Sequence, residues 1–261
     1  MRDLRRDRSR VLRLTVLSTA AYIFMITMNF LANYLPLNDI TTGAISDRYA
    51  NPFTPAGFTF AIWGLISLLL AGTLIFLIRG VVKKWERPEV IMVRISWPFI
   101  ISSLLNGLWI VSWHYDQILL SLIIMLGILF SLIWLYRRLQ GLVFSPGRYL
   151  LPFSVYLGWI SVATVANVTV YTVAVDWGRL GMSDDFWLAA VFVAVLFITG
   201  YMVFVYNDIA FALVVLWALT GIFTARWQEA GGVNFAAAAA LAAGLIVMGL
   251  IIKKMRLNQK F

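Results

Sequence analysis

Long runs of apolar residues alternate with short polar connections along most of the chain. Eight runs reach roughly 17 to 25 residues, the length of helix that crosses the hydrocarbon core of a bilayer. They cover residues 14–35, 57–78, 92–113, 117–136, 149–173, 186–206, 209–225 and 233–252. Because lipid offers the backbone no hydrogen-bond partners, each run is predicted to be a helix. The pattern predicts an all-α polytopic membrane protein with about eight transmembrane helices.

Two connections between the runs carry expectations of their own. Only Asn207 and Asp208 separate the sixth run from the seventh, which predicts a tight antiparallel hairpin. The connection 36–54 is long and rich in turn residues, which is typical of either a lid or a plain linker. At its end, Thr54 is expected to cap the next helix and Pro55 to take the first helical position.

The basic residues divide unequally between the two sides that these helices would separate. Of the 21 Lys and Arg residues, 18 lie at the two termini and in the second and fourth connections. Positive residues stay on the cytoplasmic side of a membrane. We therefore expect both termini in the cytoplasm and an even number of helices. The expected location is the plasma (inner) membrane of a bacterium.

The amino-acid composition argues against several kinds of functional site. Hydrophobic residues make up 62% and charged residues 13%, whereas a soluble domain is about half apolar and a quarter charged. The chain has no cysteine and a single histidine, so thiol chemistry is excluded and no metal site is expected. The net charge of +9 lies in clusters that set topology, so no nucleic acid partner is expected.

Four asparagines lie inside the first five predicted helices, where polar side chains are costly and therefore informative. Asn29 and Asn33 are four residues apart, on one face of the first helix. Asn106 and Asn167 lie about two turns from the outer ends of the third and fifth helices. One interpretation is hydrogen bonding between helices that stabilises their packing. Their shared depth favours the alternative, a common polar-lined cavity in the outer half of the membrane.

Several tryptophans are also expected inside the spans or near their outer ends. Tryptophan normally gathers at membrane interfaces, but Trp63 and Trp159 are expected to lie deeper, inside the second and fifth helices. Trp109 and Trp113 are four residues apart near the outer end of the third helix. The adjacent His114 is expected to form an interfacial hydrogen bond, with haem ligation the less favoured alternative. A cavity lined by Trp, Phe and Asn suits a large flat apolar ligand with a few polar groups.

Three stretches at these positions carry a resemblance to a known family. They are residues 55–63 (PAGFTFAIW), 105–109 (LNGLW) and 156–167 (YLGWISVATVAN). Together and in this order, they resemble the TspO/MBR family of tryptophan-rich sensory or translocator proteins. The chain departs from the family at Val155, where the family has proline, and at Trp113, where the family begins an aromatic pair that here includes histidine.

The resemblance implies a particular organisation of the chain. A basic cytoplasmic N-terminus over residues 1–13 would precede a TspO-like five-helix core over residues 14–173. Residues 174–261 would add a three-helix transmembrane extension with a basic cytoplasmic tail, on which the resemblance is silent.

The resemblance also implies a ligand class. Members of the family bind porphyrins, haem-like tetrapyrroles and sterols, and Trp63, Asn106, Trp159 and Ala163 match their pocket-lining positions. A porphyrin or haem is therefore expected as a ligand, with no obligatory cofactor. The same stretches and the asparagine pattern add further candidate site residues, which are Phe60, Trp109, Tyr156, Asn167, Asn29 and Asn33.

Three functions follow from these observations. The leading one is a TspO-like binding protein for tetrapyrroles or other flat hydrophobic ligands, in a sensing or transport role. A small-molecule transporter of another class is the first alternative, although every charge falls at a span end or in a connection, which leaves no acid or base inside the membrane to couple ions. The second alternative is an enzyme that acts on a lipophilic substrate. No catalytic constellation is evident, but photo-oxidative porphyrin breakdown would need none.

The last apolar run begins with alanines, and small residues let helices approach closely. Ala236, Ala240 and Gly244 are predicted to form a packing face. The partner of this face is either the chain's own core or a second copy, which would make a homodimer.

Overall fold

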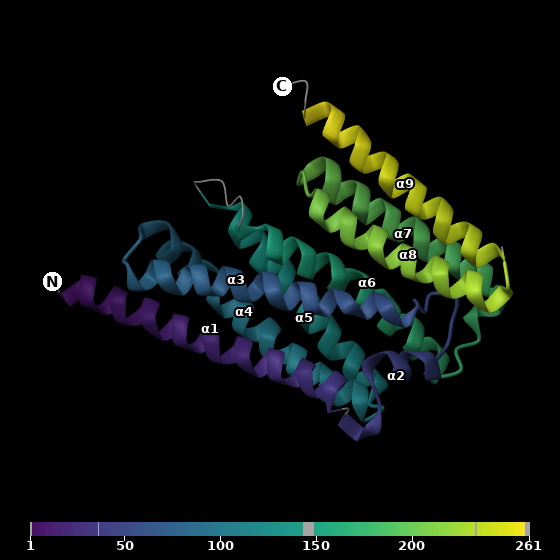
Figure 1. The fold of residues 1–261 in the computed structure, drawn as a ribbon, viewed down its shortest axis with the longest axis horizontal. Coiled ribbons are helices and arrows are strands. Elements are labelled where there is room, and N and C mark those ends of the chain that lie inside the picture. Colours follow the sequence, from purple (N-terminus) through teal and green to yellow (C-terminus); the bar gives the residue numbers. More distant parts are fainter. Residues whose placement is uncertain (1, 36, 143–148, 233, 259–261) are drawn as a thin grey trace. The chain divides into compact units, whose positions relative to one another are not determined.

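The computed structural model describes residues 2–35, 37–142, 149–232 and 234–258, without the side chains of residues 2–7, 33 and 179. Within these ranges the chain forms helices joined by short connections (Figure 1). The long helices are α1 (Arg2–Tyr34), α3 (Ile62–Val82), α4 (Glu86–His114), α5 (Ile118–Gln140), α6 (Leu151–Ala174), α7 (Asp184–Val205), α8 (Ile209–Ala230) and α9 (Phe235–Asn258). The short ones are η1 (Leu37–Asp39), α2 (Thr42–Arg48), η2 (Gly57–Ala61) and η4 (Arg179–Gly181).

The eight long helices are the elements that match the predicted spans. In the described part of the chain, all eight are long and apolar enough to cross a membrane. Each predicted apolar run falls on one of them, the second run including η2. The prediction of an all-α polytopic membrane protein with about eight helices is therefore confirmed.

The chain divides into two compact units. The first comprises Met1–Thr42 and Trp63–Tyr156, and the second comprises Gly43–Ile62 and Leu157–Phe261. The boundary falls inside α6, so this helix contributes its first residues to one unit and the rest to the other.

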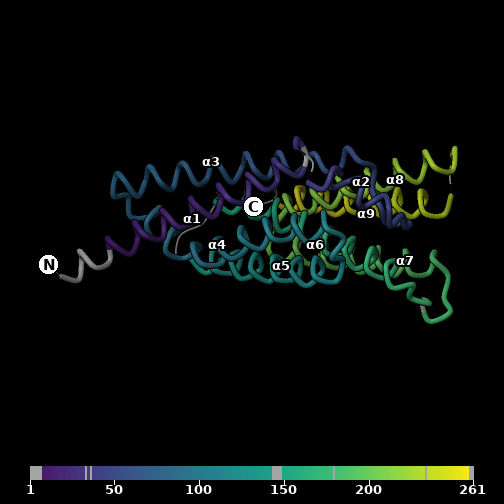
Figure 2. The backbone as a smooth tube through the Cα atoms, turned by 90° about the horizontal axis from the view of Figure 1, so that it is seen from below, coloured from purple at the N-terminus to yellow at the C-terminus, as the bar shows by residue number. Residues whose placement is uncertain are grey.

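In the first unit, α4 packs against both α1 and α5 (Figure 2). At Gly107 of α4, a methyl group would overlap the ring of Phe24 of α1. The absence of a side chain at Gly107 therefore leaves room for this ring between the two helices. At the start of α4, Glu89 forms an ion pair with Arg8 of α1.

In the second unit, α9 packs against α7 and α8, and the three helices lie side by side in Figure 1. Ala236 and Ala240 are buried, and Gly244 faces Leu216 of α8. The predicted small-residue face is therefore a packing face, and its partner is the chain's own second unit.

The hairpin between α7 and α8 forms where the sequence predicts it. Asn207 takes a left-handed backbone conformation, with a φ of 56°. This conformation suits asparagine better than most other residues. The carboxylate of Asp208 then caps α8 by accepting a hydrogen bond from the Phe211 backbone N–H at 3.0 Å. Two residues thus suffice to reverse the chain, as expected.

The entry to the second span differs from the prediction. Thr54 does not cap the helix: its hydroxyl accepts a hydrogen bond from the Asn51 backbone N–H at 3.2 Å, within a turn. The helical segment begins later, at Gly57, as a 3₁₀ turn that continues into α3. The N-cap is Ala56, without a side-chain cap. Pro55 therefore precedes the helix rather than beginning it.

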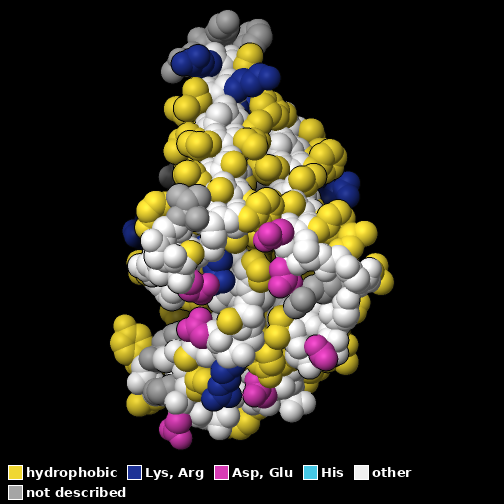
Figure 3. Space-filling view, turned by 90° about the vertical axis from the view of Figure 1, so that its right-hand side faces the viewer, with side chains coloured by type: hydrophobic (Ala, Val, Ile, Leu, Met, Phe, Trp, Pro, Cys, Tyr) yellow, Lys and Arg dark blue, Asp and Glu magenta, His cyan; other side chains and the backbone are white. Residues whose placement is uncertain are grey.

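The outer surface of the helices is strongly apolar. Large hydrophobic side chains are abundant on the face drawn in Figure 3. On several spans they are more than half exposed, as for Leu68 of α3, Phe130 of α5 and Phe197 of α7. A soluble monomer rarely exposes apolar surface on this scale. Lipid is the environment that this surface fits, so the chain is an integral membrane protein.

Candidate functional site

A chain of polar side chains crosses the interior of the first unit. The Asn29 amide of α1 donates to the Asn106 side-chain oxygen of α4 at 2.6 Å. The Asn106 amide in turn donates to the Tyr156 hydroxyl of α6 at 3.1 Å. Asn106 and Tyr156 are fully buried, and Asn29 is partly buried. We call these three residues the amide–tyrosine chain.

The last hydrogen bond of the amide–tyrosine chain, donated by Tyr156, is weak. The Tyr156 hydroxyl points to the sulfur of Met25, with 3.9 Å between the Tyr156 oxygen and the sulfur atom. A thioether sulfur is a weak hydrogen-bond acceptor. A stronger acceptor, such as a ligand oxygen, would therefore readily replace the Met25 sulfur as the partner of the Tyr156 O–H.

Indole rings lie beside the amide–tyrosine chain. The Trp63 ring of α3 lies 6.1 Å from the Tyr156 ring, edge to face, and 6.3 Å from the Trp109 ring of α4. Trp109 in turn stacks on Trp113 one turn later, at 5.5 Å between ring centroids. All three tryptophans are buried. They form a continuous aromatic row, which we call the indole row.

Neighbouring connections fix the end of the indole row. The Trp113 indole N–H donates to the Thr42 backbone carbonyl at 3.1 Å, and the Asn38 amide donates to the His114 carbonyl at 3.0 Å. These bonds tie the end of α4 to the connection that follows α1. The His114 ring is buried, and its Nδ1 lies 2.8 Å from the Ile110 carbonyl one turn earlier.

The structure therefore brings several predicted site residues into direct contact. Trp63, Asn106, Trp109, Tyr156 and Asn29 form one cluster inside the first unit. The side chain of Asn33, the remaining candidate on α1, lies outside the described residues.

Four further candidates belong to the second unit. The Trp159 ring of α6 meets the Phe60 ring of η2 edge to face, at 6.1 Å between centroids. Ala163 follows Trp159 by one turn and is partly buried. The Asn167 amide donates to the Ala163 carbonyl at 3.0 Å.

A feature that the sequence interpretation missed is the attachment of residues 54–59 to α8. The Ala56 backbone N–H donates to the Gly221 carbonyl at 3.0 Å. The Trp217 indole N–H donates to the Thr59 carbonyl at 2.9 Å, and Arg226 donates to the Thr54 carbonyl at 3.3 Å. The segment that leads into Phe60 is thus positioned by the seventh span.

Two residues of α8 signalled this attachment in the sequence. Gly221 lies within a helix, and a methyl group there would overlap the Thr59 side chain. Arg226 is buried near the end of the span and is also paired with Glu229 at 2.7 Å. A glycine inside a helix and a buried cation near its end both indicate close approach of another segment.

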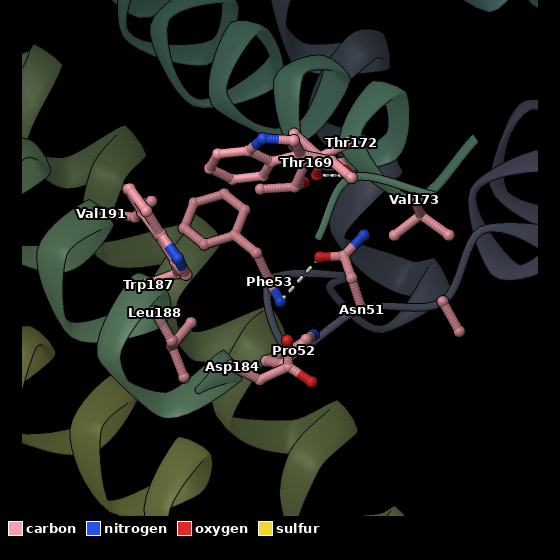
Figure 4. Close-up of a pocket in the computed structure, with 12 residues that line it drawn as sticks. Asn51, Pro52, Phe53, Thr169, Thr172, Val173, Asp184, Trp187, Leu188 and Val191 are labelled. Atoms are coloured by element: carbon pink, nitrogen blue, oxygen red, sulfur yellow. Dashed lines mark hydrogen bonds between the residues drawn. The ribbon is translucent and has the colours of Figure 1, made fainter. Parts of the chain in front are cut away.

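The second unit also holds a small cavity of about 110 Å³. It lies between residues 50–53, the end of α6 and the start of α7 (Figure 4). Phe53, Trp177 and Trp187 supply aromatic rings to its wall, and the two indoles lie 5.0 Å apart. This volume is below the roughly 300 Å³ of small-molecule sites. The cavity can therefore hold a substituent rather than a whole tetrapyrrole.

Comparison with protein families identifies the chain. A family described as TSPO-like protein matches residues 15–252. The chain belongs to the TSPO-like protein family. This finding confirms the resemblance that the three motif stretches carry. Comparisons with curated proteins and with solved structures gave no match.

The family match extends beyond the three stretches. It begins within α1 and ends within α9, so it includes the three helices that follow residue 174. In this TSPO-like protein the stretches lie at η2 and the start of α3, in the middle of α4, and in α6. Each contributes at least one ring or amide to the clusters described above.

Proposed function

We propose that this TSPO-like protein binds tetrapyrroles, such as a porphyrin or haem, or other flat hydrophobic ligands within the membrane, in a sensing or transport role. The observation that carries the proposal is the contact between the indole row and the amide–tyrosine chain inside one helical unit. Family membership supports the general type of protein.

The indole row supplies apolar contact area. Trp63 and Trp109 present large rigid ring faces, and aromatic rings attract other flat rings in offset or edge-to-face geometries. Such contacts contribute about 0.5 to 1.5 kcal/mol per ring pair beyond burial of area. A tetrapyrrole offers a wide face on which several rings can act at once.

The amide–tyrosine chain would favour ligands that carry a polar group. Asn106 uses one amide hydrogen for Tyr156 and one lone pair for Asn29, which leaves one donor and one acceptor position on the same amide. Among the described residues, the Met25 sulfur is the one acceptor that the Tyr156 O–H reaches. A ligand carbonyl or carboxylate would therefore find two donors side by side. A ligand without a polar group would leave them poorly paired.

The direction of access follows from charge and depth. Asn106 lies about 12 Å from the His114 end of α4, at 1.5 Å of rise per residue. The basic clusters lie at the opposite end of this helix, and basic residues stay in the cytoplasm. We infer that the site opens toward the extracytoplasmic side of a bacterial inner membrane, with both termini inside. The homodimer stays a prediction.

Porphyrin titration followed by tryptophan fluorescence tests the proposal. Quenching should saturate with the unaltered protein. The double variant Trp63→Ala with Trp109→Ala should bind about tenfold or more weakly, because two ring faces of the indole row are lost. Trp97→Ala is the matched control, since Trp97 lies on α4 and is 51% exposed. Equal affinity of the double variant and the control would show that the ligand binds elsewhere.

A further inference from the structure

A groove of about 380 Å³ lies in the first unit, away from the indole row. It is formed near the start of α1, the start of α4 and the end of α5. Each helix contributes one arginine to its lining, namely Arg10, Arg94 and Arg138. The remaining lining is mainly apolar, from valines of α1 and α4, together with Glu89.

The acidic residue of the groove is already neutralised. Glu89 forms an ion pair with Arg8, whose second guanidinium nitrogen donates to the Val81 carbonyl at 2.6 Å. Among the described residues, no carboxylate forms an ion pair with any of the three arginines that line the groove. Within the described part of the chain, the groove therefore presents three arginines that no carboxylate pairs with.

Arg138 is the arginine of the groove with the clearest features of an anion site. Its guanidinium lies over the Trp134 ring, 5.5 Å from the centroid, which holds the side chain in place. Its Nε is buried, and no hydrogen-bond acceptor reaches it within the described part of the chain. A buried donor without an acceptor is unfavourable, and guanidinium groups bind phosphate through paired N–H donors.

The depth of the arginines identifies the chemistry further. Arg94 lies about 12 Å from the start of α4, a helix of about 43 Å, which exceeds the roughly 30 Å hydrocarbon core. Arg138 lies in the last turn of α5, and Arg10 lies four residues before the first predicted span, which begins at residue 14. The three charges therefore lie where phospholipid headgroups meet the acyl chains, and Val11, Val90 and Val93 continue the groove with apolar surface.

We propose that this groove binds an anionic phospholipid of the surrounding membrane. Arg94 and Arg138 hold the phosphate, Arg10 closes the site from α1, and an acyl chain follows the valines. Basic pockets between transmembrane helices bind anionic headgroups in this manner. Since the site shares no residue with the indole row or the amide–tyrosine chain, it stands or falls independently of the proposed porphyrin site.

The test is native mass spectrometry of the full-length protein in detergent, titrated with phosphatidylglycerol and with phosphatidylcholine of the same acyl chains. Phosphatidylglycerol should bind about tenfold more tightly. Arg94→Gln with Arg138→Gln should lower its affinity about tenfold and remove the preference. The matched control is Arg137→Gln, because Arg137 neighbours Arg138 on α5 but is exposed and outside the groove lining.

Several outcomes would overturn the proposal. They are equal binding of the two lipids, an unchanged preference in the double variant, and an equal loss in Arg137→Gln. Inorganic phosphate forms a further arm: if it displaces phosphatidylglycerol, the site takes free phosphate rather than lipid. If the double variant does not fold, Arg10→Gln replaces it, since Arg10 is exposed on α1. That variant should still lose about fivefold in phosphatidylglycerol affinity.

Discussion

At the scale of single residues, the interior of the first unit is organised by three polar side chains from three helices. Asn106 joins the other two, as it accepts from Asn29 and donates to Tyr156. The apolar surroundings make each of these bonds hard to replace, because no water competes for the donors. The amide–tyrosine chain therefore joins three helices of the first unit, and it has a recognition role in the proposed complex.

Replacement of Tyr156 by phenylalanine separates the two roles. Tyr156→Phe leaves the Asn106 amide without its acceptor and should lower the free energy of unfolding by about 1 to 3 kcal/mol. It should also weaken porphyrin binding about fivefold or more, since the ligand loses a donor. Thermal unfolding and fluorescence titration measure the two effects.

Tyr115→Phe provides the comparison, because Tyr115 is 54% exposed at the end of α4. Its effect on stability should stay within about 0.5 kcal/mol. Lower stability with unaltered porphyrin affinity in Tyr156→Phe would limit the hydroxyl to a structural role.

At the scale of elements, α8 is more than an additional span. Backbone and indole bonds attach it to residues 54–59, the segment that carries η2 and the Phe60 ring. The contact depends on Gly221, whose lack of a side chain makes room for Thr59. The helices after residue 174 thus help to position residues that belong to the recognised motif stretches.

A single methyl group tests this attachment. Gly221→Ala should lower the free energy of unfolding by about 1 to 3 kcal/mol, because the new group overlaps Thr59. Adding Thr59→Ala should recover part of the loss, since it removes two of the overlapped atoms. Gly249→Ala in α9 meets no atom within 4 Å and should be neutral or stabilising. Equal thermal stability of the Gly221 and Gly249 variants would contradict the assigned contact.

At the scale of the whole molecule, the arrangement of spans and charges predicts the orientation in the membrane. Eight spans return the chain to the side where it began, and the basic clusters lie at the termini and in the connections on that side. The connections that follow α1 and α4 would then face outward. This predicted orientation can therefore be tested without any ligand.

The absence of cysteine makes this test direct. Single variants Lys84→Cys and Gln117→Cys place a thiol in connections that lie at opposite ends of α4, and both positions are exposed. A membrane-impermeant thiol reagent applied to intact cells should label Gln117→Cys and leave Lys84→Cys unlabelled until the membrane is opened. The reverse pattern would invert the proposed orientation and the direction in which the site opens.

The sequence alone determined the class of the protein and the position of every span. A bilayer dissolves only long apolar helices, so length and hydropathy are sufficient evidence. It also singled out Trp63 and Asn106, because polar and aromatic groups deep in a span are conspicuous. Tyr156 became a candidate through the resemblance to a known family. The tight α7–α8 hairpin followed from the same reasoning as the spans, since two polar residues leave no room for another connection.

Only the tertiary structure decided which of these groups meet. Helices surrounded by lipid are apolar on every side, so the sequence gives little indication of which face turns inward. The bond from Asn29 to Asn106, the attachment of residues 54–59 to α8 and the three-arginine groove all depend on helix rotation and close approach. These contacts join residues far apart in the chain, and packing rather than local pattern selects them.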